Sequence, residues 1–375
     1  MGVPGPASLQ FRKIAPRELI SGPGAVRRGG AAIAGLGARA ALITGEVGYP
    51  LVAETLHASL DAAAVSAWRL VHRGLCTRLA IEALAARASD LEAEVIVGVG
   101  GGVVIDVAKG VSTLTSAHFA ALPTSPATCA ATTAHTVLYA PGGAWAGSLF
   151  APGPAALVVV DTAVVGAAPA RLLAAGIVDA ISKWYEVRRA VGPGGQRAGL
   201  AVSAALDLSE GLRRTFAEHA LTAYAQALRG EVGESRRLCA EAAIVMPGLI
   251  GGLAGDAGRL AAVHPVANAL TGLPGGHRAL HGEQVGFGIL VQLHLEGRAA
   301  EAADLAAWLA DLGQPAGLAA LGCPEAAEGG PAELAIADEI AASAAVQATF
   351  PDVAAATVVA ALRAADRTAA AAAPS

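Results

Sequence analysis

The stretch Glu94–Lys109, EVIVGVGGGVVIDVAK, decides the fold. Its start is a short apolar run, EVIVGV, which predicts a strand buried on both faces of a parallel sheet. Three glycines follow, and helical spacing then predicts a helix over Ile105–Thr113. A buried strand, a glycine turn and a helix in this order are typical of nucleotide-binding α/β domains.

The patterns on either side of this stretch differ. Before it, apolar runs at 40–44 and 65–71 predict further strands, and helical spacing at 51–60 and 79–88 predicts helices between them. Beyond Pro169 the chain is rich in alanine and leucine at helical spacing; the predicted helices cover 170–190, 197–227, 234–250, 256–271, 281–296, 298–312, 332–346 and 352–370. We therefore expect a Rossmann-like parallel-sheet α/β domain over 1–167 and an all-α domain over 168–375.

Composition excludes several classes of protein. The chain has 375 residues, of which 54% are hydrophobic, enough for two folded domains with sizeable cores. A net charge of −5 and the lack of a basic run argue against nucleic-acid binding and favour a small-molecule partner. The four cysteines, Cys76, Cys129, Cys239 and Cys323, form no CxxC pair, which fits a reducing compartment.

The start of the chain and its uncharged segment 119–160 also bear on the compartment of the protein. No charged segment followed by an apolar segment opens the chain, so we expect a cytoplasmic protein. The uncharged segment 119–160 is interrupted by prolines and glycines, which would break a membrane-spanning helix of about 20 residues. We interpret this segment as buried sheet and loop.

The glycine turn predicts a phosphate site. Glycines let the backbone approach a pyrophosphate closely, and the free N–H groups at a helix start favour an anion. The residues expected to contact the cofactor here are Gly100, Gly101, Gly102, Val103, Val104 and Asp106. A glycine-rich turn in a parallel sheet can also serve packing alone, and this alternative stays open at this point.

Four segments carry a family resemblance: GGGVVIDVAK at 100–109, LPTSPATCAATTAHTVLY at 122–139, the VDT…AGIVDAISKWYE segment within 158–186, and 259–288 with its HGEQVGFG. In this order they resemble the glycerol dehydrogenase branch of the metal-dependent, "iron-containing" alcohol dehydrogenase superfamily, across roughly residues 10–300. The resemblance implies a dehydroquinate synthase-like fold, with a metal in the cleft between the two domains.

The resemblance assigns three metal ligands, Asp179, His264 and His281. One carboxylate and two imidazoles leave an open position, as a catalytic zinc requires. Iron-type members add a histidine one helical turn after the aspartate; Lys183 stands there instead, so zinc is favoured over iron. Taken singly, the aspartate could cap a helix and the histidines could be core or surface residues. His277, four residues before His281, is an alternative ligand.

Further positions are expected to contact the dinucleotide. Glu46, after the first predicted strand, can accept hydrogen bonds from ribose hydroxyls and would repel a 2′-phosphate, which favours NAD over NADP; alternatively it is a solvated loop acid. By motif position Thr124, Thr133 and Tyr139 resemble cofactor-contacting residues. His135 stands where the family usually has leucine.

Two departures from the family pattern concern the substrate. Cys129 replaces an aspartate of glycerol dehydrogenases, and a thiol accepts hydrogen bonds from a diol poorly. The TCA sequence there resembles the hydroxycarboxylate dehydrogenases, so a 2-hydroxy acid is favoured over glycerol, although Cys129 can also be a small buried hydrophobe. In HPVA at 264–267, Pro265 is expected to remove a helix hydrogen bond, and Ala267 replaces a histidine able to aid proton transfer.

The resulting hypothesis is an NAD(H)-dependent alcohol dehydrogenase. The metal would lower the pKa of the substrate hydroxyl, and the hydride would pass to the nicotinamide. A sugar-phosphate cyclase of the dehydroquinate synthase type is a rival, as is a non-catalytic binding descendant. Family resemblance also leads us to expect a homo-oligomer.

Overall fold

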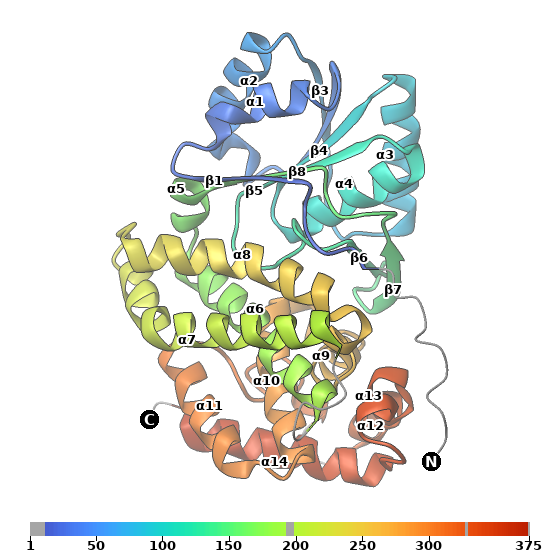
Figure 1. The fold of residues 1–375 in the computed structure, drawn as a ribbon. Coiled ribbons are helices and arrows are strands. Elements are labelled where there is room, and N and C mark those ends of the chain that lie inside the picture. Colours follow the sequence, from blue (N-terminus) through green and yellow to red (C-terminus); the bar gives the residue numbers. More distant parts are fainter. Residues whose placement is uncertain (1–11, 193–198, 327–328, 374–375) are drawn as a thin grey trace.

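The sheet that was predicted from Glu94–Lys109 is present in a computed structural model, which describes residues 12–192, 199–326 and 329–373 (Figure 1). Six parallel strands lie in the order β1-β8-β5-β4-β2-β3. Their bounds are β1 Glu18–Gly22, β2 Arg39–Thr44, β3 Ser66–Val71, β4 Val95–Gly100, β5 His118–Pro123 and β8 Leu157–Asp161. The apolar run of β4 lies between β2 and β5 and is buried along its whole length. The predicted fold class is thereby confirmed.

Helices cover both faces of this sheet; they are α1 Val26–Ala34, α2 Ala53–Ala62, α3 Arg78–Asp90, α4 Gly102–Thr115 and α5 Thr162–Gly166. Successive strand residues point to opposite faces. Leu42 and Val97 therefore pack with α1 and α2, whereas Ile43 and Ile96 pack with α3 and α4. The strand β1 and the helix α1 were not predicted from the sequence.

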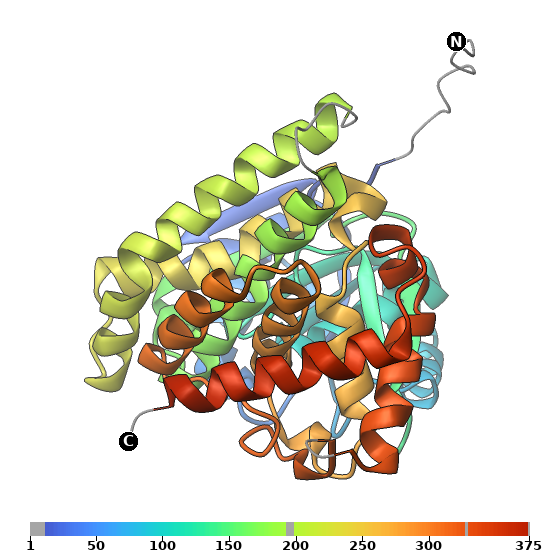
Figure 2. The same ribbon diagram turned by 90° about the horizontal axis from the view of Figure 1, so that it is seen from below.

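The second half of the chain is helical. Its helices are α6 Ala170–Val191, α7 Leu200–Leu228, α8 Glu234–Ala254, α9 Val263–Thr271, α10 His281–Leu295, α11 Ala299–Asp311, α12 Pro331–Ala342, α13 Ala344–Thr349 and α14 Ala355–Ala372. Seen from below, α14 crosses under the other helices and packs on α10 and α11 (Figure 2). The predicted start of one helix at 197–198 lies outside the described residues.

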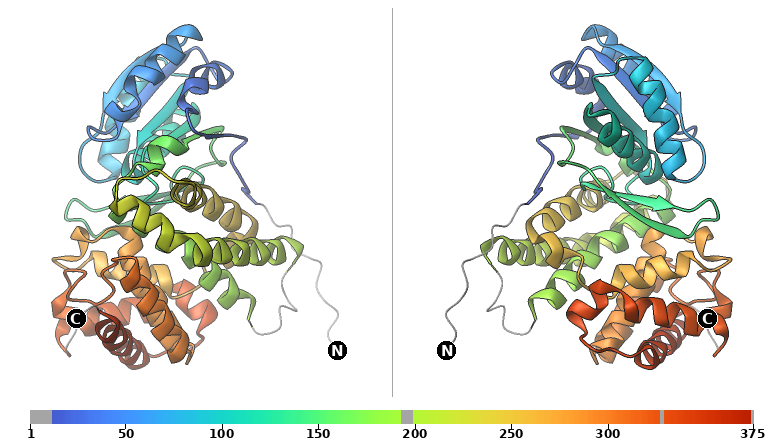
Figure 3. Two further views of the ribbon diagram at one scale, coloured as in Figure 1. Left: turned by 90° about the vertical axis from the view of Figure 1, so that its left-hand side faces the viewer. Right: turned by 90° about the vertical axis from the view of Figure 1, so that its right-hand side faces the viewer.

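A two-stranded antiparallel hairpin, β6 His135–Tyr139 and β7 Trp145–Phe150, lies between the sheet and the helices (Figure 3). The backbone N–H of Trp145 donates to the Thr271 hydroxyl of α9 at 2.8 Å. The hairpin therefore connects the α/β part to the helix that carries His264.

Two predicted helices are wrong in extent. The one at 256–271 is broken: a 3-10 turn, η2 Gly255–Gly258, ends before the next helix begins at Val263. Gly255 has φ +60°, a conformation that ends α8 and favours glycine. The one at 332–346 is divided at Ser343, whose backbone is extended (ψ 129°).

Pro265 costs no helix hydrogen bond, contrary to expectation. It lies in the first turn of α9, where a backbone N–H has no partner within the helix. Proline is tolerated at this position, so the departure from the family pattern does not distort the helix.

One segment, Glu234–Gly258, is long and apolar enough to cross a membrane by length and composition alone. It comprises α8 and η2, more than half of its apolar 18-residue window is buried inside the fold, and α8 packs against α6 and α7. This is the pattern of a core helix.

Glycine at position 282 allows α6 and α10 to approach closely. A Cβ atom on Gly282 would lie 1.9 Å from the backbone oxygen of Ala175 in α6. We expect Gly282→Ala to force the two helices apart and to lower the free energy of unfolding by about 1–3 kcal/mol, as overpacking does. Denaturant unfolding measures this change.

Gly211, in the middle of α7, is the matched control because a Cβ there would meet no atom within 4 Å. Gly211→Ala should be neutral or raise the free energy of unfolding by roughly 0.5–1 kcal/mol, since alanine favours helix. Equal effects at the two positions would show that the close approach of α6 and α10 is unimportant.

Candidate metal centre

Asp179, His264 and His281 converge, although they come from three different helices. Asp179 lies in the middle of α6, His264 in the first turn of α9, and His281 begins α10. One potential ligand atom from each lies within 4.8 Å of the others. The Asp179 Oδ1 atom is 3.6 Å from His281 Nε2 and 3.9 Å from His264 Nε2. Because Asp179 is within a helix and not at its start, the alternative that it caps a helix is wrong.

The charge state of this group suits a cation. Asp179 is 3% exposed, so its carboxylate is largely removed from water. Burial lowers the pKa of His281, more than the nearby Asp179 raises it, which favours the neutral imidazole. A carboxylate and neutral imidazoles are the forms that bind divalent metals.

Glu186 orients one of the two histidines. It lies two helical turns after Asp179 on α6, is fully buried, and accepts a hydrogen bond from His264 Nδ1 at 2.6 Å. With its Nδ1 proton held in this way, His264 presents Nε2 toward Asp179. Carboxylates that fix a ligating imidazole in this manner are a common feature of metal sites.

Lys183 neutralises the same carboxylate. Its Nζ donates to Glu186 Oε2 at 2.5 Å and to the Gly258 backbone oxygen at 3.4 Å. Burial alone would raise the pKa of Glu186, but its interactions with His264 and Lys183 outweigh burial and lower that pKa to about 2. The ammonium of Lys183, one helical turn after Asp179, is therefore paired with the buried carboxylate of Glu186.

Cys129 lies within the electrostatic influence of Asp179 and Lys183. Burial raises the pKa of its thiol to about 12, the charge of Asp179 adds to the rise, and Lys183 opposes it. The thiol is therefore neutral at physiological pH. Tyr139 is near as well: burial, Asp106 and Asp179 are among the causes that raise the pKa of its phenol to about 12.

The glycine turn lies at the carboxyl end of β4, where α4 begins at Gly102 with Gly101 before it. A Cβ on Gly101 would meet no atom closer than 4.0 Å, so the turn has open space over it. Thr124 follows the neighbouring strand β5, and its backbone N–H donates to the Gly100 carbonyl at 3.0 Å. The turn and Thr124 thus form one edge of the sheet.

The other residues of the glycine turn and of α4 that were expected to contact the cofactor differ in their exposure. Val103 is 38% exposed, whereas Val104 is buried and packs under Gly100. Asp106 faces inward: its carboxylate accepts from Lys109 Nζ at 3.0 Å and from the Val137 backbone N–H at 3.3 Å. Asp106 therefore ties α4 to the hairpin.

Two more residues that were expected to contact the cofactor, Thr133 and Glu46, interact with other residues of the protein. The Thr133 hydroxyl lies 3.5 Å from the His135 backbone oxygen. Glu46, beyond the carboxyl end of β2, forms an ion pair with Arg73 at 2.6 Å, and both side chains are more than half exposed. The hydrogen bond and the charge of Arg73 lower the pKa of Glu46. Exposed pairs of this kind are weak and can exchange partners.

His277 is separated from the converging group. It lies in a 3-10 turn, Gly276–Arg278, that ends before α10 begins, so it is not one helical turn before His281. Its Cβ instead lies close to Gly143 in the turn of the hairpin.

Glu186 was missed as a functional residue from the sequence. A spacing of seven residues places it on the same helical face as Asp179, and this spacing is the signal that could have revealed it.

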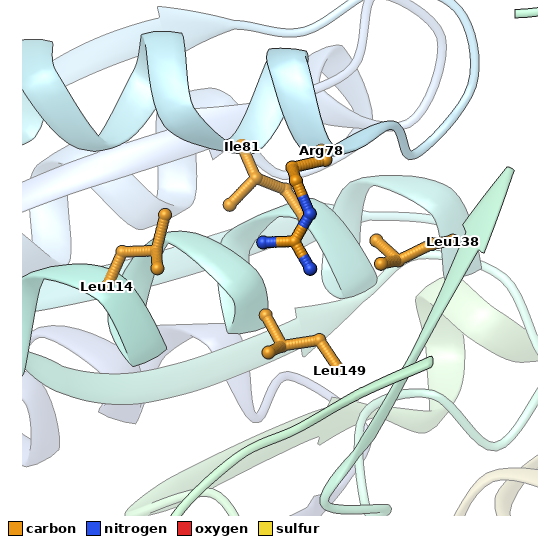
Figure 4. A pocket seen from close by; sticks show the side chains of 5 residues that line it. All are labelled: Arg78, Ile81, Leu114, Leu138 and Leu149. Carbon is orange, nitrogen blue, oxygen red and sulfur yellow. The ribbon is translucent and has the colours of Figure 1, made fainter. Parts of the chain in front are cut away.

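A different pocket, lined by Arg78, Ile81, Leu114, Leu138 and Leu149, lies between α3, α4 and the hairpin (Figure 4). Its lining is aliphatic apart from one guanidinium, and the space between these side chains leaves no room for a water molecule. It is a packing gap and carries no chemistry.

Comparison with known proteins yields one consistent group. Residues 16–162 match the family model of iron-containing alcohol dehydrogenases. A glycerol dehydrogenase of Pseudomonas putida is 34% identical over 292 residues, which cover 75% of this chain and 76% of that protein. Hydroxycarboxylate dehydrogenase A of Escherichia coli is 33% identical over 229 residues, 61% of this chain and 63% of that protein.

The fold has a close counterpart among solved structures. The crystal structure of a probable glycerol dehydrogenase from Sinorhizobium meliloti superimposes with a TM-score of 0.85 at 28% identity, covering 96% of this chain and 99% of that one.

Proposed function

Because the chain belongs to the iron-containing alcohol dehydrogenase family, we propose that it is a metal-dependent, NAD(H)-linked oxidoreductase acting on a 2-hydroxy acid or a related secondary alcohol. The observation that carries the proposal is the convergence of Asp179, His264 and His281 in a fold that also has a dinucleotide-type glycine turn at the carboxyl end of its central strand β4. The oxidoreductase class follows from the family. The cofactor, the metal and the substrate are the proposed parts.

The three side chains fit a divalent cation. Their ligand atoms are mutually close, and Glu186 already engages His264 Nδ1, so that Nε2 is free to bind. Three protein ligands leave a position for substrate. When bound, the cation supplies a Lewis acid that polarises a substrate oxygen and lowers the pKa of a hydroxyl group.

Lys183 supports zinc over iron. It lies one helical turn after Asp179, at the position where the iron-type members of the family have a histidine. Its ammonium is paired with Glu186, so it offers no lone pair as a fourth ligand. We propose a three-ligand zinc site on this basis.

The remaining residues bind and orient the cofactor. The backbone N–H groups at the start of α4 would hold the pyrophosphate, with Gly101 leaving space for its approach. Glu46 would accept hydrogen bonds from the adenosine ribose in exchange for its exposed pair with Arg73, which favours NAD. Val103, Thr124, Thr133 and Tyr139 are proposed to line the same cofactor site.

A substrate screen tests the proposal. Purified protein, with and without added zinc, is given NAD and a 2-hydroxy acid, a vicinal diol or a simple secondary alcohol, and NADH formation is followed. We expect zinc-dependent NADH formation with the 2-hydroxy acid. A sugar-phosphate cyclase would produce no net NADH because it regenerates its cofactor internally, and a binding-only protein would be inactive throughout.

The choice between 2-hydroxy acid and glycerol is proposed to depend on Cys129. Its neutral thiol accepts hydrogen bonds poorly, whereas an aspartate at this position could accept them from a diol. We expect Cys129→Asp to raise kcat/KM for glycerol relative to a 2-hydroxy acid by roughly tenfold, the effect of one charge-assisted hydrogen bond. Steady-state kinetics with both substrates measure the ratio.

Cys239, a fully buried cysteine of α8 that lies outside the converging group, provides the control. Cys239→Ala should leave the substrate ratio unchanged. If Cys129→Asp also leaves the ratio unchanged, position 129 does not select the substrate.

A further inference from the structure

Arg259 lies against an aromatic side chain of the hairpin. Its guanidinium carbon is 5.2 Å from the ring centroid of Phe150. The same ring stacks with His135 at 5.2 Å between centroids and an interplanar angle of 26°, and His135 Nε2 is held by the Ser148 hydroxyl at 2.6 Å. The Phe150 ring thus contacts both a guanidinium and an imidazole.

This arrangement adjoins the metal centre. Lys183 donates to the carbonyl of Gly258, the residue directly before Arg259. The short segment after Arg259 leads to the first turn of α9, which carries His264. Arg259 therefore lies in the segment between Gly258, which accepts a hydrogen bond from Lys183, and the first turn of α9, which carries His264.

Several cationic side chains act on His135. Burial lowers the pKa of His135 to about 3, and Lys109, Arg259, His264 and Lys183 add to this shift. His135 is therefore neutral, and the cations Lys109, Lys183 and Arg259 act on the same imidazole. A substrate anion placed here would be attracted by a cation whose charge is not already balanced by a buried carboxylate.

Among these cations Arg259 differs in its partner. Lys109 and Lys183 are largely buried and each is paired with a carboxylate, Asp106 or Glu186, that is also withdrawn from water. Arg259 is half-exposed, and its partner Asp256 is 87% exposed. Such a solvent-screened pair is weak, so an incoming carboxylate can replace Asp256 at little cost.

We propose that Arg259, supported by the Phe150 ring and adjoining His135, binds the carboxylate of the substrate and so determines preference for 2-hydroxy acids over neutral alcohols. A guanidinium can hold a carboxylate through two parallel hydrogen bonds, and stacking on an aromatic ring restricts its orientation. The inference rests on the proposed function and extends it by naming the group that recognises the acid.

Binding of an inert 2-oxo acid analogue is the first test. Oxamate carries a carboxylate, and oxamide is its neutral counterpart. Each is titrated calorimetrically into zinc- and NADH-loaded enzyme. We expect Arg259→Gln to weaken oxamate binding roughly ten- to a hundredfold, the effect of losing hydrogen bonds to a charged group. Arg259→Lys should retain part of the affinity, and oxamide binding should be unaffected by either variant.

Arg229 provides the matched control. It is also about half-exposed and paired with a surface acid, Glu231, at the far end of α7. Arg229→Gln removes the same charge and should leave oxamate binding unchanged. If Arg259→Gln behaves like Arg229→Gln, or if oxamide binds the wild type as well as oxamate does, the inference is overturned.

Kinetics with a matched pair of substrates separate this inference from the proposed function. With 2-hydroxypropanoate and propane-1,2-diol, Arg259→Gln should raise KM for the acid with little change in kcat and leave KM for the diol nearly unchanged. If wild-type enzyme oxidises the diol but not the acid, the inference fails while the dehydrogenase stands. If it oxidises neither, the proposed function fails, and the oxamate titration still decides whether Arg259 binds a carboxylate.

Discussion

His281→Ala is expected to abolish NAD-linked turnover almost completely, with a loss of roughly a thousandfold or more. A Lewis acid contributes several kcal/mol of stabilisation to a developing charge, and about 1.4 kcal/mol corresponds to a factor of ten in rate. Removing one of three ligands leaves Asp179 and His264 as the only proposed protein ligands. Initial rates at saturating NAD and substrate measure the loss.

His294, near the other end of α10, is the control for this substitution. It is hydrogen-bonded to Thr368 at 3.0 Å and lies outside the converging group. His294→Ala should keep turnover within a few-fold of the wild type. Near-normal turnover by His281→Ala, with a zinc content equal to that of the wild type, would contradict the assignment.

Glu186→Gln is expected to weaken metal binding by roughly 10–100-fold, the usual cost of losing a partner that orients a metal ligand. The amide carries no charge, so it would hold the His264 proton more weakly and leave the Lys183 ammonium without its internal counter-charge. Competition with a chelator of known affinity measures the change. Excess zinc should restore much of the activity, because Asp179, His264 and His281 are all retained.

Glu333→Gln gives a matched control for this change. Glu333 is also a fully buried carboxylate paired with a cation, Arg363 at 2.7 Å, but it belongs to α12 and lies outside the converging group. Its substitution should lower stability without changing zinc affinity. Equal loss of zinc affinity in both variants would mean that Glu186 acts only through general stability.

Local patterns predicted much of the fold. The apolar run of β4 and the glycines after it are contiguous, so the sequence shows them directly. The strand β1 escaped prediction because it is mostly exposed at the edge of the sheet and has no alternating pattern (ELISG). The break between η2 and α9 escaped it because Arg259–Ala262 continues the apolar helical spacing on either side.

The candidate site was predicted in part. Motif positions identified Asp179, His264 and His281, and the structure brings the three together. The inward direction of Asp106 could not be predicted, since its partners Lys109 and Val137 depend on where the hairpin packs. The same holds for Arg259 and Phe150, which are far apart in sequence and meet only through tertiary packing.

Asp179, His264 and His281 are proposed to hold one divalent cation. The most direct test is the zinc content of purified protein after dialysis, compared between the wild type and a variant with all three residues changed to alanine. We expect about one zinc per chain in the wild type and none in the triple variant, with both chains folded by circular dichroism. Equal zinc content in the two proteins would contradict the account.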